Sequence, residues 1–289
     1  MASRRQSLGL AAAGLAGGLL ALRQGRGLIL PSATAAAKPI ELLLPGALTQ
    51  GGWLRGRTTG QALSLDGRPV ALADDGMFLI AFDRDARPAA LLTAQLETGG
   101  TAELPLTVAP RAWQIENVNI ARRGGGPTDD FMAIRAPELA RIAAARALQT
   151  GAQGWRQKFM WPAKGRISGK FGSQRVYRGE PGAYHSGLDI ATGASGTPYV
   201  APADGVVILA AERPFTLEGN LLMLDHGMGL NSAFLHSSQL LVKEGDVVWQ
   251  GQVIARIGMT GRATGPHLHW SMKWGDARLD PLLFTGPMV

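Results

Sequence analysis

The stretch GMTGRATGPHLHW at residues 258–270 joins a glycine-rich turn to a segment that predicts a β-strand, His267–Met272. Similar short apolar runs occur earlier in the chain, at Tyr199–Ala201, Gly205–Ala211, Asn220–Asp225, Ser232–His236 and Val253–Ile257. Turns rich in Gly and Asp separate these runs. We therefore expect residues 155–289 to form an antiparallel β-sheet domain.

The N-terminal half also alternates strand-like runs with turns. These runs are Ile40–Leu44, Gly52–Arg57, Met77–Phe82 and Leu104–Val108. We expect residues 38–121 to form a small β-sandwich-like domain, so that the whole chain is mainly β. This region contains no histidine, which favours a structural or targeting role. Trp53 and Trp113 are expected in its core, although a sugar could also stack on either ring.

The sequence RRGGGP at residues 122–127 predicts a linker between the two β regions. Pro137 and Glu138 follow it and suit the first turn of a helix. Apolar residues then recur at every third position and predict one apolar stripe, at Leu139, Ile142, Ala145 and Leu148. We expect one or two helices within residues 128–150, in a linking segment that spans residues 122–154.

Composition and charge restrict the possible functions. The 289 residues contain no cysteine, which excludes disulfides, thiolate zinc sites, iron–sulfur clusters and a cysteine nucleophile. The net charge is +7, but four arginines and no acidic residue lie in residues 1–37. The remaining 25 basic and 22 acidic residues leave a net charge of +3 and form no basic block. We therefore expect no nucleic-acid partner.

Residues 1–37 predict an export signal. Arg4 and Arg5 precede a weakly apolar, glycine-rich run from Leu8 to Leu22, which is too short to span a bilayer. Small-residue triplets suited to cleavage follow this run. Paired arginines before such a run resemble a twin-arginine signal, and an ordinary secretory signal or an uncleaved anchor is the alternative. We expect an exported protein that is periplasmic or secreted.

All five histidines lie between residues 185 and 269. Three local patterns contain four of them: His185 with Asp189 four residues later, His236 in an apolar run, and His267 with His269. In a strand, residues i and i+2 point to one face about 6.6 Å apart. The last pair therefore suits one metal ligand and one neighbour poised over the metal.

Imidazoles and a carboxylate together supply the nitrogen and oxygen donors that zinc accepts. A closed structural zinc site needs four protein ligands, and this chain has no cysteine to complete one. We therefore expect an open zinc site with one position left for water, which is typical of catalytic sites. His226, between Asp225 and Gly227, is expected to be a structural turn residue.

The histidine patterns also resemble a known family. HSGLD at residues 185–189, His236 and HLH at residues 267–269 resemble, in this order, the three motifs of the LytM/lysostaphin-type zinc metallopeptidases. The surroundings match as well, with GKFG at 169–172, APADG at 201–205 and the glycine-rich turn at 258–266. The resemblance covers about residues 161–283. Phe234 departs from it, because tyrosine is common at that position.

The resemblance implies that His185, Asp189 and His269 bind one zinc ion per chain. It also implies that His236 and His267 are the catalytic pair, one accepting a proton and the other stabilising the oxyanion, in an order that it leaves open. The implied activity is hydrolysis of peptide cross-links in peptidoglycan by an exported endopeptidase peripheral to the cell envelope. The alternative is a non-catalytic wall-binding or hydrolase-activating module on the same fold.

Overall fold

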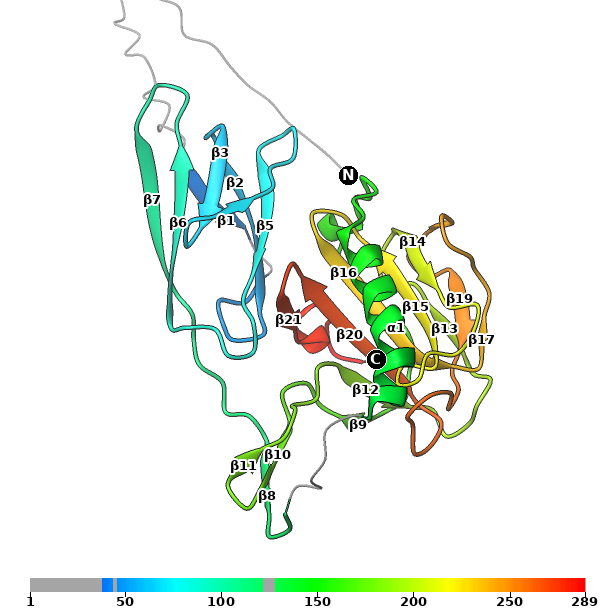
Figure 1. Ribbon diagram of the computed structural model, residues 1–289. Coiled ribbons are helices and arrows are strands. Elements are labelled where there is room, and N and C mark those ends of the chain that lie inside the picture. The colour runs from blue at the N-terminus through cyan, green and yellow to red at the C-terminus, as the bar shows by residue number, and fades with distance from the viewer. Residues whose placement is uncertain (1–37, 44–45, 122–127, 289) are drawn as a thin grey trace, which may run out of the picture. The chain divides into compact units, whose positions relative to one another are not determined.

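The computed structural model describes residues 38–43, 46–121 and 128–288, and these residues are mainly β (Figure 1). Among them are one α-helix, α1 (Asp129–Ala147), and two short 3₁₀ helices, η1 (Gly154–Arg156) and η2 (Pro281–Leu283). The predicted mainly-β class is confirmed. The expected export signal in residues 1–37 and the RRGGGP stretch lie outside the described residues.

Two sheets pack around one core in the N-terminal region, in the orders β1-β2-β5 and β4-β3-β6-β7 (Figure 1). Their strands are β1 (Ile40–Leu43), β2 (Trp53–Thr58), β3 (Ala62–Leu65), β4 (Arg68–Val70), β5 (Met77–Ala81), β6 (Ala89–Gln95) and β7 (Thr101–Thr107). Alternate residues of β6 are buried, namely Ala90, Leu92 and Ala94. This period of two puts one face of the strand into the core, as a sandwich requires.

Strands β2 and β5 bury both of their faces. Leu54 and Ile80 belong to the core of the N-terminal sandwich, whereas Trp53 belongs to the core of the C-terminal region. The Trp53 ring stacks on Phe284 with centroids 4.7 Å apart, and its Nε1–H donates to Leu283 O at 3.0 Å. Trp53 is therefore a core residue, and the two β regions are joined through it.

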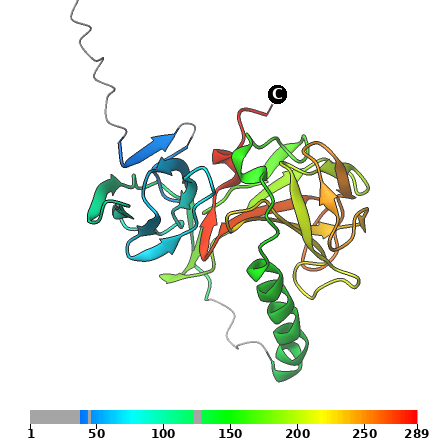
Figure 2. The same ribbon diagram turned by 90° about the horizontal axis from the view of Figure 1, so that it is seen from above.

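The C-terminal region is built on an eight-stranded sheet of order β18-β14-β15-β16-β20-β12-β9, with β21 added beside β20. Its strands are β9 (Arg166–Gly169), β12 (Leu188–Ala191), β14 (Gly205–Ala210), β15 (Asn220–Asp225), β16 (Leu230–Ser237), β18 (Val247–Val248), β20 (Leu268–Trp274) and β21 (Ala277–Leu279). A smaller sheet contains β13 (Pro198–Val200), β19 (Val253–Arg256) and β17 (Gln239–Leu240) (Figure 2). The strands of both sheets pair antiparallel, as predicted. Tyr199, Phe234 and Trp270 are fully buried in the core.

A third small sheet combines the two regions. Strand β8 (Ile115–Val118) pairs in parallel with β10 (Gln174–Tyr177), and β10 also pairs with β11 (Glu180–Pro181). The sequence does not predict β8, because its residues are exposed or half-exposed and show no apolar alternation. The sheet places a strand that follows the N-terminal sandwich beside the segment that leads to His185.

Helix α1 lies within residues 128–150, where one or two helices are predicted, but it begins before Pro137. Thr128 caps it by accepting a hydrogen bond from the Phe131 N–H at 3.2 Å, and Asp129 and Asp130 occupy its first turn. Pro137 lies inside the helix and not in its first turn, which corrects the expectation. The helix tolerates a proline here at the cost of one backbone hydrogen bond.

The predicted apolar stripe of α1 is only half correct. Ile142 and Ala145 pack against residues of β14 and β15, but Leu139 and Leu148 are 45% and 52% exposed. Each step of three residues turns a helix by roughly 300°, so four such positions sweep across about half of its circumference. Only the middle two can face the sheet.

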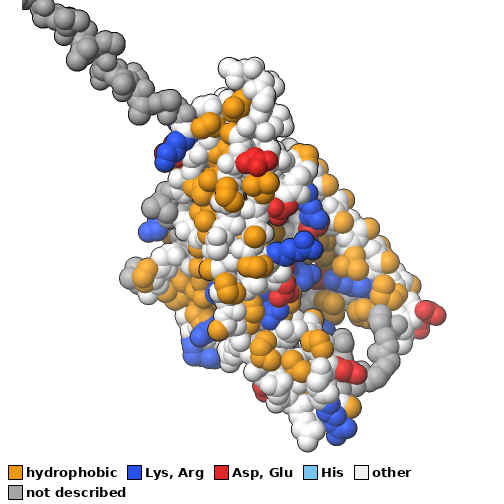
Figure 3. Space-filling view, turned by 90° about the vertical axis from the view of Figure 1, so that its left-hand side faces the viewer, with side chains coloured by type: hydrophobic (Ala, Val, Ile, Leu, Met, Phe, Trp, Pro, Cys, Tyr) orange, Lys and Arg blue, Asp and Glu red, His pale blue; other side chains and the backbone are white. Residues whose placement is uncertain are grey.

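Charged side chains are dispersed over the face of the molecule shown in Figure 3. Lys and Arg side chains lie there among Asp and Glu side chains and do not gather into one basic patch. Opposite charges form ion pairs among the described residues, such as that between Arg156 Nη1 and Asp75 Oδ2 at 2.9 Å. This face therefore has no extended surface of one charge.

Candidate active site

The three expected ligands meet where β12 and β20 lie side by side. Asp189 on β12 pairs in register with His269 on β20, so both side chains project from the same place on the sheet. His185 precedes β12 and reaches the same place. The donor atoms His185 Nε2, Asp189 Oδ1 and His269 Nδ1 form a triangle with sides of 2.8, 3.1 and 3.1 Å.

This donor triangle, defined by His185, Asp189 and His269, fits a zinc ion. Tetrahedral zinc binds nitrogen and oxygen at about 2.0–2.2 Å, which places neighbouring donors roughly 3.3 Å apart. The sides of the triangle are close to that length. Among the described residues, the cluster of potential metal ligands comprises these three and no fourth side chain. Two imidazoles and one carboxylate are also a donor set that zinc accepts in catalytic sites.

Hydrogen bonds within the triangle keep the carboxylate charged. Burial alone would raise the pKa of Asp189, but hydrogen bonds from His185 and His269 outweigh it and hold that pKa well below its ordinary range. Burial lowers the pKa of His269, which favours its neutral form. Burial would also lower the pKa of His185, but Asp189 outweighs it and raises that pKa. At a given pH, His185 is therefore protonated in a larger fraction of molecules than His269. A cation that binds His185 has to displace this proton first.

One backbone carbonyl, Lys170 O, orients the His185 ring. Its Nδ1–H donates to Lys170 O at 3.1 Å, and a carbonyl only accepts, so the neutral ring keeps its proton on Nδ1 and offers Nε2 to a metal once the Nε2 proton is displaced. The same segment holds the backbone, since Gly172 N–H donates to His185 O and His185 N–H donates to Ser173 O, both at 2.8 Å. The GKFG stretch thus fixes the position and the tautomer of His185.

His236 and His267 lie beside the triangle. His267 Nε2 is 3.7 Å from Asp189 Oδ1, and the rings of His236 and His267 are 4.9 Å apart. The Nδ1–H of His267 donates to Gly265 O and that of His236 donates to Thr260 O, both at 2.8 Å. In the neutral form of each ring, Nδ1 carries the proton and Nε2 is the unprotonated nitrogen. Burial lowers the pKa of His236, which favours this neutral form.

His226 lies apart from the other four histidines. Its ring is fully buried, its Nδ1–H donates to Asp204 O at 2.8 Å, and its Nε2 accepts from Ser232 Oγ at 2.8 Å. Burial lowers its pKa to about 4. His226 is therefore a neutral residue that joins a turn to a strand.

This buried imidazole should make the stability of the fold depend on pH. The folded pKa of His226 is about 4, below the ordinary 6.5, so the unfolded chain takes up a proton first as the pH falls. The free energy of unfolding should then fall between pH 6.5 and pH 4, by at most about 1.4 kcal/mol per pH unit. Urea unfolding at several pH values should show a smaller slope for His226→Gln than for the wild type. Equal slopes would contradict this assignment.

Gly187 lies against His269 and leaves no room for a side chain. A Cβ at this position would lie 2.5 Å from His269 Nε2 and 2.7 Å from Trp270 O. We expect Gly187→Ala to displace the His269 ring and to weaken zinc binding by about 10- to 100-fold. Competition with a chelator measures this affinity. The sequence shows Gly187 only as part of HSGLD, because its role depends on the approach of β20.

Gly286→Ala is the matched control, since the nearest atom to its Cβ would be Lys158 Nζ at 3.7 Å, an ordinary contact. This variant should bind zinc like the wild type. Wild-type affinity in Gly187→Ala would show that the His269 ring does not need the space.

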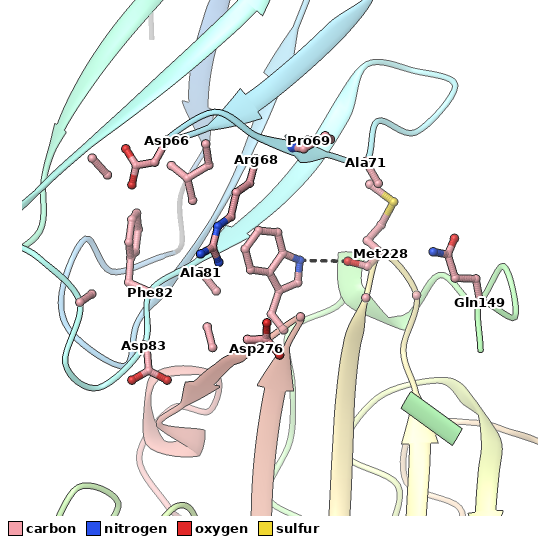
Figure 4. Close-up of a pocket in the computed structure, with 18 of the residues that line it drawn as sticks. Asp66, Arg68, Pro69, Ala71, Ala81, Phe82, Asp83, Gln149, Met228 and Asp276 are labelled. Carbon is pink, nitrogen blue, oxygen red and sulfur yellow. Dashed lines mark hydrogen bonds between the residues drawn. The ribbon is translucent and has the colours of Figure 1, made fainter. Parts of the chain in front are cut away.

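The triangle lies in a groove of about 1260 Å³. His185 and Asp189 line it, together with Glu116 from β8, Arg175 from β10 and Arg262. A second cavity, of about 1120 Å³, lies elsewhere, and Arg68, Phe82 and Met228 are among its lining residues (Figure 4). Trp274 also lines this second cavity and donates its Nε1–H to Met228 O at 3.0 Å. No histidine lines this second cavity, whereas His185 and Asp189 line the groove.

Comparison with known proteins gives a family match for the part of the chain that contains the triangle. Residues 183–281 match the family model described as Peptidase family M23. The chain is 38% identical over 117 residues to peptidoglycan DD-endopeptidase ShyA of Vibrio cholerae, which is 40% of this chain and 26% of the relative. It is 42% identical over 105 residues to peptidoglycan DD-endopeptidase ShyB of the same organism, which is 36% of this chain and 24% of the relative.

The likeness to a solved structure extends beyond the matched residues. A crystal structure assigned to peptidase M23 from Pseudomonas aeruginosa is 29% identical, with a TM-score of 0.64, over 82% of this chain and 95% of that one. The alignments with the two curated relatives span only about a quarter of their lengths.

Proposed function

We propose that this chain is an exported zinc endopeptidase that hydrolyses peptide cross-links in peptidoglycan, because residues 183–281 match the family model described as Peptidase family M23. The observation that carries the proposal is the donor triangle of three side chains with two further imidazoles beside it. The substrate class is that of ShyA and ShyB, both named peptidoglycan DD-endopeptidases.

His185, Asp189 and His269 would hold one zinc ion. A bound zinc ion lowers the pKa of a coordinated water and polarises a carbonyl group. In their neutral forms His236 and His267 each present Nε2 without a proton, so one of them can accept the proton of the attacking water and return it to the leaving amine. The other can stabilise the negative oxygen that develops on the carbonyl, once its own Nε2 carries a proton. The water oxygen bonds to the carbonyl carbon, and the C–N bond breaks.

The hydrolytic part of the proposal is tested with defined cross-linked muropeptides. Mass spectrometry of the products should show fragments from cleavage of a peptide bond, and the same preparation should contain one zinc per chain. Intact muropeptides in the presence of one bound zinc would contradict an enzymatic role. Binding to sacculi without release of fragments would instead support the non-catalytic wall-binding module.

We also propose that residues 1–37 direct export by a twin-arginine route. No helix among the described residues combines the length and the apolar character needed to cross a membrane. Arg4 and Arg5 precede the apolar run at the position that such a signal requires. Retention in the cytoplasm of a variant with Arg4→Lys and Arg5→Lys would support this route, and normal export of that variant would contradict it.

A further inference from the structure

His236 has an unusual backbone conformation for a strand residue. Its φ is +67°, in the left-handed region, and it lies within β16. The other described non-glycine residues with positive φ, which are Asp66, Arg178 and Met228, lie in turns. A left-handed conformation at a non-glycine strand residue costs free energy and persists only where the surroundings hold it in place. The position of the His236 ring therefore depends on its neighbours.

Those neighbours are two loops packed against each other. The loop Phe215–Gly219 accepts the His236 N–H at Glu218 O, at 2.8 Å. The loop Thr260–Arg262 accepts the His236 Nδ1–H at Thr260 O, also at 2.8 Å. Arg262 N–H donates to Leu217 O at 3.0 Å. The loops meet so closely that a Cβ on Gly219 would collide with Thr260.

Helix α1 holds the first of these loops through a buried ion pair. Arg135 is 7% exposed and donates from both terminal nitrogens to the two Glu218 carboxylate oxygens, each at 2.6 Å. Its Nη1 also donates to Glu138 Oε2 at 2.9 Å. Glu138 in turn accepts from the Thr216 N–H at 2.7 Å and from Thr216 Oγ1 at 2.6 Å. Two residues of α1 therefore fix two residues of the loop.

The hydrogen bonds of this cluster favour the charged forms of Arg135 and Glu138. The hydrogen bonds that Arg135 donates to Glu218 raise the pKa of Arg135. Burial would raise the pKa of Glu138, but the hydrogen bonds from Thr216 and Arg135 outweigh it and lower that pKa. A bidentate pair of this kind fixes direction as well as distance, because the planar guanidinium matches both carboxylate oxygens. Glu218 is thus held at its side chain by α1 while its carbonyl oxygen holds His236.

We propose that Arg135 of α1 is a positioning residue, which fixes the backbone and ring of His236 through Glu218. The importance of this role for hydrolysis rests on the proposed function, in which His236 is one of the catalytic pair. Helix α1 is then part of the catalytic apparatus, although none of its residues lies in the donor triangle.

The test compares two variants. Arg135→Met keeps a side chain of similar length but removes the charge, and Arg135→Lys keeps the charge but cannot donate to both Glu218 oxygens through a planar guanidinium. In Arg135→Met we expect kcat on muropeptides to fall by about 10- to 100-fold, with KM and zinc content unchanged. Exchange of the His236 amide proton, followed by NMR in the zinc-loaded protein without substrate, should become at least about tenfold faster. Arg135→Lys should lie between Arg135→Met and the wild type in both measurements.

Ile134→Ala is the matched control, because Ile134 lies on the same helix and is 57% exposed. It should leave both measurements unchanged. If Arg135→Met does not fold, the same two measurements on Glu218→Gln decide the question. That variant keeps the shape of the side chain and removes its charge.

A His236 amide exchange rate within twofold of the wild type in the folded variant would overturn the proposal. A kcat loss accompanied by loss of zinc would also overturn it, since the defect would then lie at the metal ligands. Because amide exchange is measured without substrate, it tests the positioning role even if the wild type hydrolyses no muropeptide. A wild type that hydrolyses no muropeptide would contradict the proposed function. The His236 amide exchange rate alone would then decide whether Arg135 positions His236.

Discussion

Replacing His185 by alanine should abolish zinc binding and peptide hydrolysis together. The variant leaves two donors, Asp189 Oδ1 and His269 Nδ1, which cannot hold a tetrahedral ion as three can. Loss of the metal removes several kcal/mol of transition-state stabilisation, on the order of 10³-fold in rate or more. Zinc content after dialysis and release of muropeptide fragments should be measured on the same sample.

Ser186→Ala is a suitable control for this experiment, because Ser186 is the next residue and contributes no atom to the donor triangle. It should keep one zinc and full activity. Complete hydrolysis of muropeptides by metal-free His185→Ala would contradict the proposed mechanism.

Replacing His267 by alanine should separate metal binding from catalysis. His267 Nε2 lies 3.7 Å from Asp189 Oδ1, outside the three short contacts of the triangle. The variant should therefore retain one zinc, whereas its kcat should fall by roughly 10²–10⁴-fold, a usual contribution of a general acid or base. Steady-state kinetics on a defined muropeptide, with zinc content as the second readout, measures both effects.

The partner variant sharpens this experiment. His236→Ala should also retain zinc and lose rate, and the double variant should be little slower than either single one if the two rings act as a unit. Loss of zinc in His267→Ala would mean that His267 is a ligand. An unchanged kcat would exclude it from the catalytic pair.

The strands of the C-terminal region are well predicted by local sequence. Gly205–Ala211 and Asn220–Asp225, for example, correspond to β14 and β15, because short apolar runs between Gly and Asp turns leave few other conformations. Local sequence does not predict which distant segments pair with each other. Strand β8 is exposed and is a strand because its backbone pairs with β10. Its own residues show no alternation of apolar and polar side chains.

Helix α1 shows where the local pattern misleads. Pro137 suggests a helix start, but the cap Thr128 and the acidic residues of the first turn, Asp129 and Asp130, lie seven to nine residues earlier. Its buried face also contains a charged residue, Arg135, which an apolar pattern excludes. The compensating partner Glu218 is distant in sequence, so the pair appears only in the folded chain.

For the candidate site, the sequence supplies the residue types and their order but not their distances. The resemblance implies His185, Asp189 and His269 as ligands, and the fold brings their donor atoms together through the register of β12 and β20. The steric role of Gly187 depends on that same register. The left-handed conformation of His236 has no counterpart in the sequence, because histidine rarely adopts it without external support.

A crystal structure of the zinc-loaded protein, with anomalous diffraction at the zinc absorption edge, tests the central claim most directly. We expect one anomalous peak at about 2.0–2.2 Å from His185 Nε2, Asp189 Oδ1 and His269 Nδ1, with a water and no fourth protein ligand. A peak elsewhere in the chain, or a fourth protein donor that closes the coordination sphere, would contradict it.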